Sequence, residues 1–278
     1  MLNIRYVAGV SWPRSGHHLV QRLLQEYFGP DFVYCEFYDP ELDCCRVFPC
    51  TRSRVHFSKN HDRDLSGVMT AGLPYLIQYR SAAAAAVSDF ELHLRDGHSD
   101  TAREFETFAL HRARRWGKFV SKWVDGSDGL ERLIVRYEHL TEDPLGTMAP
   151  IIQFFSPDVA VDRDKLTHTI ATIPAIQITK IDEQWIEKAG VQSPRQVEDF
   201  RFYDLDLFRR IETVAQKSRR TAATASSMRV SGVSIDRIFP ARIQFKDTLI
   251  RALAALAVPI GKGRASALRK LRRLVSGK

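Results

Sequence analysis

A segment near the start of the chain combines basic and hydroxyl side chains that could bind an anion. Residues 11–19 read Ser-Trp-Pro-Arg-Ser-Gly-His-His-Leu and follow the apolar residues 4–10. The apolar residues predict a buried strand, and the spacing after Gly16 predicts a helix that ends at Gly29. A turn between them directs the free N–H groups of the helix towards one point, where an anion also interacts favourably with the helix dipole. Arg14 adds a permanent charge on a planar group suited to phosphate or sulfate.

The same segment has a simpler interpretation, an ordinary tight turn with an exposed arginine. It is not a Walker A loop, because that loop needs a lysine followed by serine or threonine directly after its last glycine. Here His17 and His18 follow Gly16. Alone, the segment indicates either a plain turn or an anion-binding turn of another kind.

Arg80 and Ser88 form a second candidate pair. Arg80 follows a strand predicted for Tyr75–Tyr79, and Ser88 lies about two turns into a helix predicted for Ala82–Leu94. The carboxyl ends of strands are where α/β sheets bind ligands. An Arg and a Ser at this spacing also occur by chance in a chain of this composition, so a helix cap with an exposed serine is the alternative.

A lysine and a histidine follow another predicted strand, Arg54–Ser58. Lys59 and His61 are two residues apart, so on an extended segment they point to the same side. The ordinary pKa of histidine, about 6.5, suits proton abstraction near neutrality. A surface or core histidine is the alternative. A fourth segment, residues 136–144 (Arg-Tyr-Glu-His-Leu-Thr-Glu-Asp-Pro), continues a predicted strand into an acidic turn and alone predicts a loop.

The elements that would position these residues alternate between strand and helix. With 278 residues, 44% of them hydrophobic, the chain can bury one large core. We therefore predict a three-layer α/β fold with about five parallel strands and helical crossovers. The predicted strands are residues 4–10, Phe32–Phe37, Arg54–Ser58, Tyr75–Tyr79 and Arg132–Tyr137. The predicted helices are residues 19–27, Ala82–Leu94, Thr101–Val124 and Met148–Phe155.

Charge divides the chain into a domain, residues 1–216, and a basic segment, residues 217–278. The formal net charge is +8, yet the second segment has 15 lysines and arginines against two acidic residues, so the first is net acidic. Small polar residues at 218–234 predict a linker. The sequence has no apolar stretch of about 18 residues and no signal-peptide pattern at its start, so a cytoplasmic location is expected.

The end of the chain predicts short amphipathic helices, with apolar residues at helical spacing over 245–256 and again over 268–275 among arginines and lysines. Such a helix can lie on the inner face of a membrane that contains anionic lipid. Packing of residues 245–256 on the domain is the alternative. Nucleic acid is not expected as a partner, because the segment lacks interleaved aromatic residues.

Four cysteines lie close together in the sequence: Cys35, Cys44, Cys45 and Cys50. Their spacing does not match the CxxC pairs typical of zinc sites, so no metal is predicted. Local disulfides and buried thiols both remain open.

Together the four segments resemble the sulfotransferase family that uses 3′-phosphoadenosine 5′-phosphosulfate (PAPS). Residues 12–19 resemble the family's loop around the 5′-phosphosulfate, and residues 58–62 are similar to its Lys-Thr-His segment. Arg80 and Ser88 resemble its ligands for the 3′-phosphate. Residues 136–144 resemble its Tyr-Glu-Asp-Leu segment, whose tyrosine lies near the adenine. All four occur in the family's order, within about half of the chain.

The resemblance implies a fold like that of P-loop nucleotide kinases and transfer of a sulfuryl group from PAPS to an acceptor hydroxyl without a metal. It implies that His61 accepts the proton of the hydroxyl, while Lys59 and Arg14 stabilise charge on the transferred group. It further implies that Arg80 and Ser88 bind the 3′-phosphate. The other donor-binding residues that it implies are Ser15, Gly16, His17, His18 and Tyr137, with Arg14 in both roles.

Three positions depart from the family. Arg14 replaces the lysine of the cytosolic members, while carbohydrate-type members often have arginine there. This favours a carbohydrate or glycolipid acceptor, with a small phenol or alcohol second. Leu19 stands where many members have a tryptophan that stacks on adenine. No clear Arg-Lys-Gly segment for the 3′-phosphate is present, and Lys180 or Arg195 are candidates to replace it.

Two other functions fit parts of the sequence. One is a nucleotide-dependent, P-loop-like kinase, against which the missing Lys-Ser/Thr after Gly16 argues. The other is a noncatalytic protein that binds a membrane surface and has a decayed site. The basic end of the chain supports that function, but the pair of Lys59 and His61 does not.

Overall fold

A five-stranded parallel sheet forms the centre of the protein in the computed structural model. The strand order is β2-β3-β1-β4-β5, and every neighbouring pair is parallel, which confirms the predicted α/β class. The strands are β1 (Val7–Ser11), β2 (Tyr34–Glu36), β3 (Phe57–Asn60), β4 (Tyr75–Tyr79) and β5 (Arg132–Arg136). The structure describes residues 3–37, 45–126, 129–178, 185–194 and 196–230.

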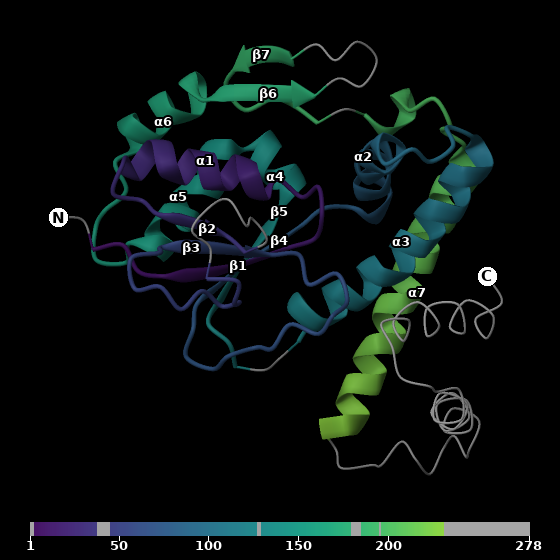
Figure 1. Cartoon of the computed structure of the whole chain (residues 1–278), viewed down its shortest axis with the longest axis horizontal. Helices are drawn as coiled ribbons and strands as arrows, with labels where there is room; N and C mark the ends of the chain where they lie inside the picture. The colour runs from purple at the N-terminus through teal and green to yellow at the C-terminus, as the bar shows by residue number, and fades with distance from the viewer. Residues whose placement is uncertain (1–2, 38–44, 127–128, 179–184, 195, 231–278) are drawn as a thin grey trace, which may run out of the picture. The chain divides into compact units, whose positions relative to one another are not determined.

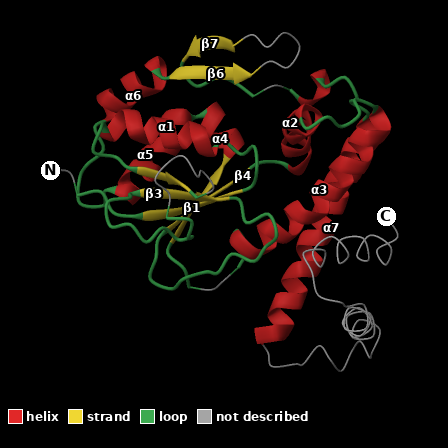
Figure 2. Ribbon diagram, viewed as in Figure 1, coloured by secondary structure: helices red, strands yellow, loops and turns green. Residues whose placement is uncertain are grey.

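Helices cover both faces of this sheet and give the predicted three layers. The helices are α1 (His17–Phe28), α2 (Ala82–Arg95), α3 (Ala102–Trp123), α4 (Tyr137–Glu142), α5 (Pro144–Phe155), α6 (Arg163–Thr172) and α7 (Leu205–Val230). Successive strand side chains point to opposite faces, so Val7 packs with α1, α4, α5 and α6, whereas Ala8 packs with α2, α3 and α7. Figures 1 and 2 show these two groups of helices on either side of the strands.

The acidic turn predicted for residues 136–144 is largely helical. Tyr137 begins α4 instead of ending a strand. Pro144 takes the first position of α5, where its missing N–H has no helical partner to lose, and Asp143 accepts the N–H of Gly146 at 2.9 Å as a cap. The helix predicted from Met148 therefore begins about one turn earlier.

A small antiparallel sheet and a 3₁₀ turn follow α6 along the chain. The sheet pairs β6 (Pro174–Ile178) with β7 (Trp185–Ala189), and a 3₁₀ turn, η1, covers Val197–Asp199. None of these was predicted, because their sequences lack a clear apolar period. No helix within the described ranges is long and apolar enough to cross a membrane.

The long helix α7 replaces the linker expected from residue 218 onwards, up to Val230. The small polar residues that suggested a linker allow close packing of α7 on α3. Ser218 donates a hydrogen bond to the carbonyl oxygen of Arg114 at 2.7 Å, and Arg219 makes a bidentate pair with Asp125. The first compact unit accordingly extends to Ala225, beyond the boundary predicted at residue 216, and a second unit begins at Ser226. The amphipathic segments predicted at 245–256 and 268–275 lie outside the described residues.

We predict that Gly117→Ala destabilises the first unit by about 1–3 kcal/mol, the usual cost of overpacking a tight contact. Gly117 lies where α3 meets α7, and a Cβ there would approach the backbone nitrogen of Arg219 to 2.6 Å, which is closer than backbone can tolerate without moving. Urea denaturation followed by circular dichroism measures the change. Lys118→Ala, at the exposed neighbouring position, is the control; equal stability of the two variants would mean that α7 does not dock here.

Candidate functional site

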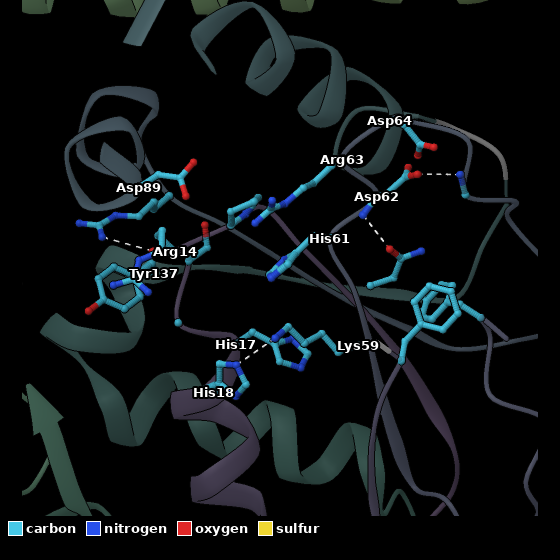
Figure 3. Close-up of a pocket in the computed structure, with 18 of the residues that line it drawn as sticks. Arg14, His17, His18, Lys59, His61, Asp62, Arg63, Asp64, Asp89 and Tyr137 are labelled. Carbon is cyan, nitrogen blue, oxygen red and sulfur yellow. Dashed lines mark hydrogen bonds between the residues drawn. The ribbon is translucent and has the colours of Figure 1, made fainter. Parts of the chain in front are cut away.

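One cavity of about 1200 Å³ lies at the carboxyl ends of β1, β3 and β4. This is the edge at which parallel α/β sheets bind ligands. Figure 3 shows labelled side chains from several separate segments around it. All ten residues singled out from the sequence line it: Arg14, Ser15, Gly16, His17, His18, Lys59, His61, Arg80, Ser88 and Tyr137.

The loop after β1 has the geometry of an anion site. Gly16 adopts φ 80° and is the N-cap of α1, but it supplies no side chain to cap the first helical turn. A Cβ at this position would lie 2.6 Å from the ring of Tyr137, so only glycine lets the ring pack on the loop. Arg14 also has a positive φ, 65°, which is uncommon for a residue with a side chain. Such strain is typical of functional loops.

Arg80 is a buried cation that lacks a carboxylate partner within the described residues. One of its terminal nitrogens donates to the carbonyl oxygen of Arg14 at 3.3 Å, and its guanidinium lies 4.5 Å from the ring centroid of Tyr137. Its Nε is buried with no hydrogen-bond partner in the part of the chain that the structure describes, and the same holds for Oγ of Ser15. Burial lowers the pKa of Arg80. Buried charge of this kind needs a counter-charge, so the arrangement favours an anionic ligand.

Arg14 and Ser88 are joined directly across the cavity wall. Nε of Arg14 donates to Oγ of Ser88 at 3.0 Å. The hydroxyl hydrogen of Ser88 can then be donated to a third group. Arg80, Arg14 and Ser88 thus form one connected chain of donors.

Lys59 is buried, and two neighbours orient its ammonium group. Nζ lies 2.5 Å from Oε1 of Glu36 and 2.9 Å from Nε2 of His18. An ammonium group has three hydrogens, so one remains for a ligand. Burial, and then the charge of Lys59, lower the pKa of His18, so that its neutral ring can accept this hydrogen bond.

The ring of His17 belongs to the core rather than to the cavity surface. It stacks on Phe57 with centroids 4.8 Å apart, and its Nε2 lies 3.1 Å from the hydroxyl of Tyr34. Burial lowers its pKa well below the usual value. His17 can therefore contribute to an anion site through its backbone N–H, at the start of α1. Nδ1 of its ring is buried and has no hydrogen-bond partner in the part of the chain that the structure describes.

His61 is held in the tautomer that a general base requires. Its Nδ1 lies 2.8 Å from the carbonyl oxygen of Ser11, which can only accept, so Nδ1 carries the hydrogen and Nε2 has the free lone pair. Burial lowers the pKa of His61 to about 3, and the charges of Lys59 and Arg63 add to this effect. The imidazole is consequently neutral at pH 7.

Asp62 anchors the loop that carries His61. It is buried, and its carboxylate accepts hydrogen bonds from Nζ of Lys122 and Nε1 of Trp123, each at 2.7 Å, and from the N–H of Gly67 at 2.6 Å. These bonds tie the residues after β3 to the end of α3. By fixing the loop, the Asp62 side chain also fixes the position of the adjacent residue, His61.

Sequence reasoning missed the acidic and polar partners of the predicted residues. Glu36 is the last residue of β2, and Lys59 lies in β3. The parallel pairing of these two strands brings the residues opposite each other. Gln78 is fully buried beneath the loop. A polar residue inside an otherwise apolar strand is a sequence signal that could have marked it as a site residue. Leu19 lines the cavity. The candidates Lys180 and Arg195 lie outside the described residues.

Comparisons with known proteins give structural neighbours only. No protein-family model matches the chain, and no curated protein matches it. The mouse sulfotransferase SULT7A1 complexed with PAP is 14% identical over 83% of this chain and 89% of its own, with a TM-score of 0.48. The sulfotransferase domain of the Synechococcus PCC 7002 olefin synthase is 14% identical over 82% and 96%, with a TM-score of 0.37. The sulfotransferase domain from the curacin biosynthetic pathway is 12% identical over 81% and 98%, with a TM-score of 0.38.

We predict that Asp62→Ala destabilises the fold by about 3 kcal/mol or more, because it leaves the Lys122 ammonium without its carboxylate and the buried Trp123 N–H without its acceptor. Thermal or urea denaturation measures the change. Asp64→Ala is the matched control, since Asp64 is exposed and, among the described residues, its carboxylate accepts hydrogen bonds from Ser66 in its own loop. A loss of stability as small as that of the control would show that Asp62 does not anchor the loop.

Proposed function

We propose that this chain transfers a sulfuryl group from PAPS to an acceptor hydroxyl. The observation that carries the proposal is the convergence on one cavity of a histidine with a free Nε2 and three cations, Arg14, Lys59 and Arg80. Sulfuryl transfer, like phosphoryl transfer, asks mainly for positioning and for stabilisation of negative charge. The cavity supplies both through side chains of the chain itself.

The donor would lie along the loop after β1. The N–H groups at the start of α1 and Oγ of Ser15 suit the 5′-phosphate, because the helix start lacks a side-chain cap. Nε of Arg80 and the hydroxyl of Ser88 suit the 3′-phosphate. Tyr137 packs beside Gly16 with the Arg80 guanidinium over its ring, so its side chain lies next to both proposed phosphate sites and suits a position near the adenine.

In the transfer step, the bond between sulfur and the bridging oxygen of the donor breaks while a bond between sulfur and the acceptor oxygen forms. Nε2 of His61 accepts the hydroxyl proton. Lys59, with its remaining hydrogen, and Arg14 stabilise the charge that develops on the bridging and sulfuryl oxygens. Glu36 and His18 fix the direction of the Lys59 ammonium, so that its position does not depend on the ligand.

A kinase function is less well supported by these residues. The loop has no Lys-Ser/Thr after Gly16, and the buried Arg80 provides a site for a 3′-phosphate, which ATP lacks. Comparing the affinity for adenosine 3′,5′-bisphosphate with the affinity for ATP therefore distinguishes a sulfotransferase from a kinase.

For the acceptor, we propose a hydroxyl of a carbohydrate or glycolipid. The walls beyond His61 combine the aromatic rings of Phe37 and Phe48 with the charged side chains of Arg63 and Asp64. Aromatic faces beside polar groups suit sugar rings, and they also leave a small phenol as the second candidate. Incubation with labelled PAPS and fractionated lipid and polysaccharide extracts distinguishes them: label confined to small phenolic products would overturn the first choice.

We predict that His61→Ala lowers the transfer rate by about 100- to 10,000-fold, the usual cost of losing a general base, and leaves nucleotide binding nearly intact. The labelled-donor assay measures the rate, and a thermal shift with adenosine 3′,5′-bisphosphate measures binding. His139→Ala, at an exposed position outside the cavity, is the control. A His61→Ala variant that keeps more than about a tenth of the wild-type rate would exclude His61 as the base.

The proposed role of His61 as a base also determines how kcat/KM changes with pH. The base must be neutral, and a lowered pKa keeps His61 neutral to lower pH. The acidic decline of kcat/KM should therefore begin below pH 6.5, the ordinary value for histidine.

We predict that Arg80→Ala weakens binding of adenosine 3′,5′-bisphosphate by about 10- to 150-fold, equivalent to about 1.5–3 kcal/mol for a charge-assisted hydrogen bond. Binding of adenosine 5′-phosphosulfate, which lacks the 3′-phosphate, should change much less. Calorimetric titration measures both, with Arg136→Ala, an exposed arginine, as the control. Equal weakening of the two ligands would contradict the assignment, and wild-type protein that binds ATP but not the bisphosphate would favour a kinase.

A further inference from the structure

Three cysteine sulfur atoms converge at the edge of the sheet, away from the cavity residues that the proposed transfer uses. Cys35 lies on the edge strand β2, and Cys45 and Cys50 lie in the segment that leads to β3. Their Sγ atoms all lie within 4.8 Å of one another, and those of Cys45 and Cys50 are 3.3 Å apart. The sequence left disulfides and thiols open; the structure has all three as thiols.

The distances suit coordination of one metal ion by three sulfurs. Two sulfurs bound to the same tetrahedral zinc, each at about 2.3 Å, are about 3.8 Å apart, close to the separations seen here. A disulfide would use two of the sulfurs and leave the third beside it. The spacing in the sequence gave no hint of this, because the ligands are separated by nine and four residues rather than arranged as CxxC pairs.

The surroundings also suit a thiolate site. Cys35 and Cys50 are buried with Val55, while Tyr6 and Val33 pack against them, so these two side chains are shielded from bulk water and Cys45 is half-buried.

Backbone and side-chain bonds connect this group to the strand that carries Lys59. The N–H of Cys50 donates to the hydroxyl of Tyr6 at 2.7 Å, and that hydroxyl lies 2.7 Å from Oγ of Ser58. Cys35 directly precedes Glu36, the carboxylate partner of Lys59. A metal ion here would fix β2, which has only three residues and is paired on one side.

We propose that Cys35, Cys45 and Cys50 bind one thiophilic metal ion of the Zn²⁺ class, which ties the edge strand β2 to the segment before β3. Each thiol releases its proton to solvent on binding, and the fourth coordination position takes water or another small ligand. The ion holds the fold together and takes no part in the proposed transfer.

The test uses the full chain, produced in zinc-supplemented medium and purified under reducing conditions. We expect one equivalent of Zn²⁺ by elemental analysis, and a thiolate-to-metal charge-transfer absorption when Co²⁺ replaces it. Cys35→Ser and Cys50→Ser should weaken Zn²⁺ binding, measured against a chromophoric chelator, by more than the roughly 10- to 100-fold that loss of an outer-shell partner costs. Removal of the metal should lower the melting temperature of the wild-type chain.

His98→Gln is the matched control, because it alters the other described group of metal-binding side chains, His93, His98 and Glu104, and should leave the bound zinc unchanged. Loss of zinc from the control, or retention of full affinity in both serine variants, would overturn the proposal. So would reduced wild-type protein without stoichiometric zinc, or metal-free protein in which Cys45 and Cys50 form a disulfide. If the serine variants do not fold, the Co²⁺ spectrum of the wild type decides: absence of the charge-transfer band overturns the site.

Discussion

Mutual repulsion among cations is the constraint on which the rest of the site depends. Arg14, Lys59 and Arg80 meet at one cavity, and the burial of Lys59 and Arg80 strengthens the repulsion between like charges. The fold offsets part of it: Glu36 pairs with Lys59, and the ring of Tyr137 faces the guanidinium of Arg80. The positive charge that is not offset in this way is available to an anionic ligand. A site built in this way gains most when it binds a ligand with several negative charges.

Burial, together with this positive charge, keeps the histidines of the site neutral. Burial lowers the pKa values of His17, His18 and His61, and nearby cations lower them further. Each neutral ring has one donor and one acceptor nitrogen, so its neighbours decide what it can do. The carbonyl oxygen of Ser11 takes the hydrogen of His61 Nδ1 and leaves Nε2 as the acceptor nitrogen, while Lys59 makes Nε2 of His18 an acceptor. His17, stacked on Phe57, has become part of the core.

The sheet could be predicted from local patterns, and the ten residues singled out from the sequence, several of them only through the family resemblance, all line one cavity. Buried parallel strands are apolar throughout, and strand ends can be found from them, as at Arg80 after Tyr75–Tyr79. The partners Glu36 and Ser11 escaped prediction because their roles arise from pairing between strands distant in sequence, and Asp62 because its partners Lys122 and Trp123 lie on α3. The end of helix α7, from Ser218 onwards, was taken for a linker, since small residues that permit close helix packing resemble flexible sequence until the partner Gly117 is known.

Arg80 donates a hydrogen bond to the carbonyl oxygen of Arg14, and Arg14 donates one to Oγ of Ser88. The donor groups are therefore already oriented, and little side-chain freedom remains to be lost when a ligand arrives. Binding at this edge should follow a single encounter step whose rate is set by diffusion and electrostatic attraction, rather than by loop rearrangement. Selectivity then has to come from how fast the wrong ligand leaves, because a rigid, cationic site admits every small anion at a similar rate.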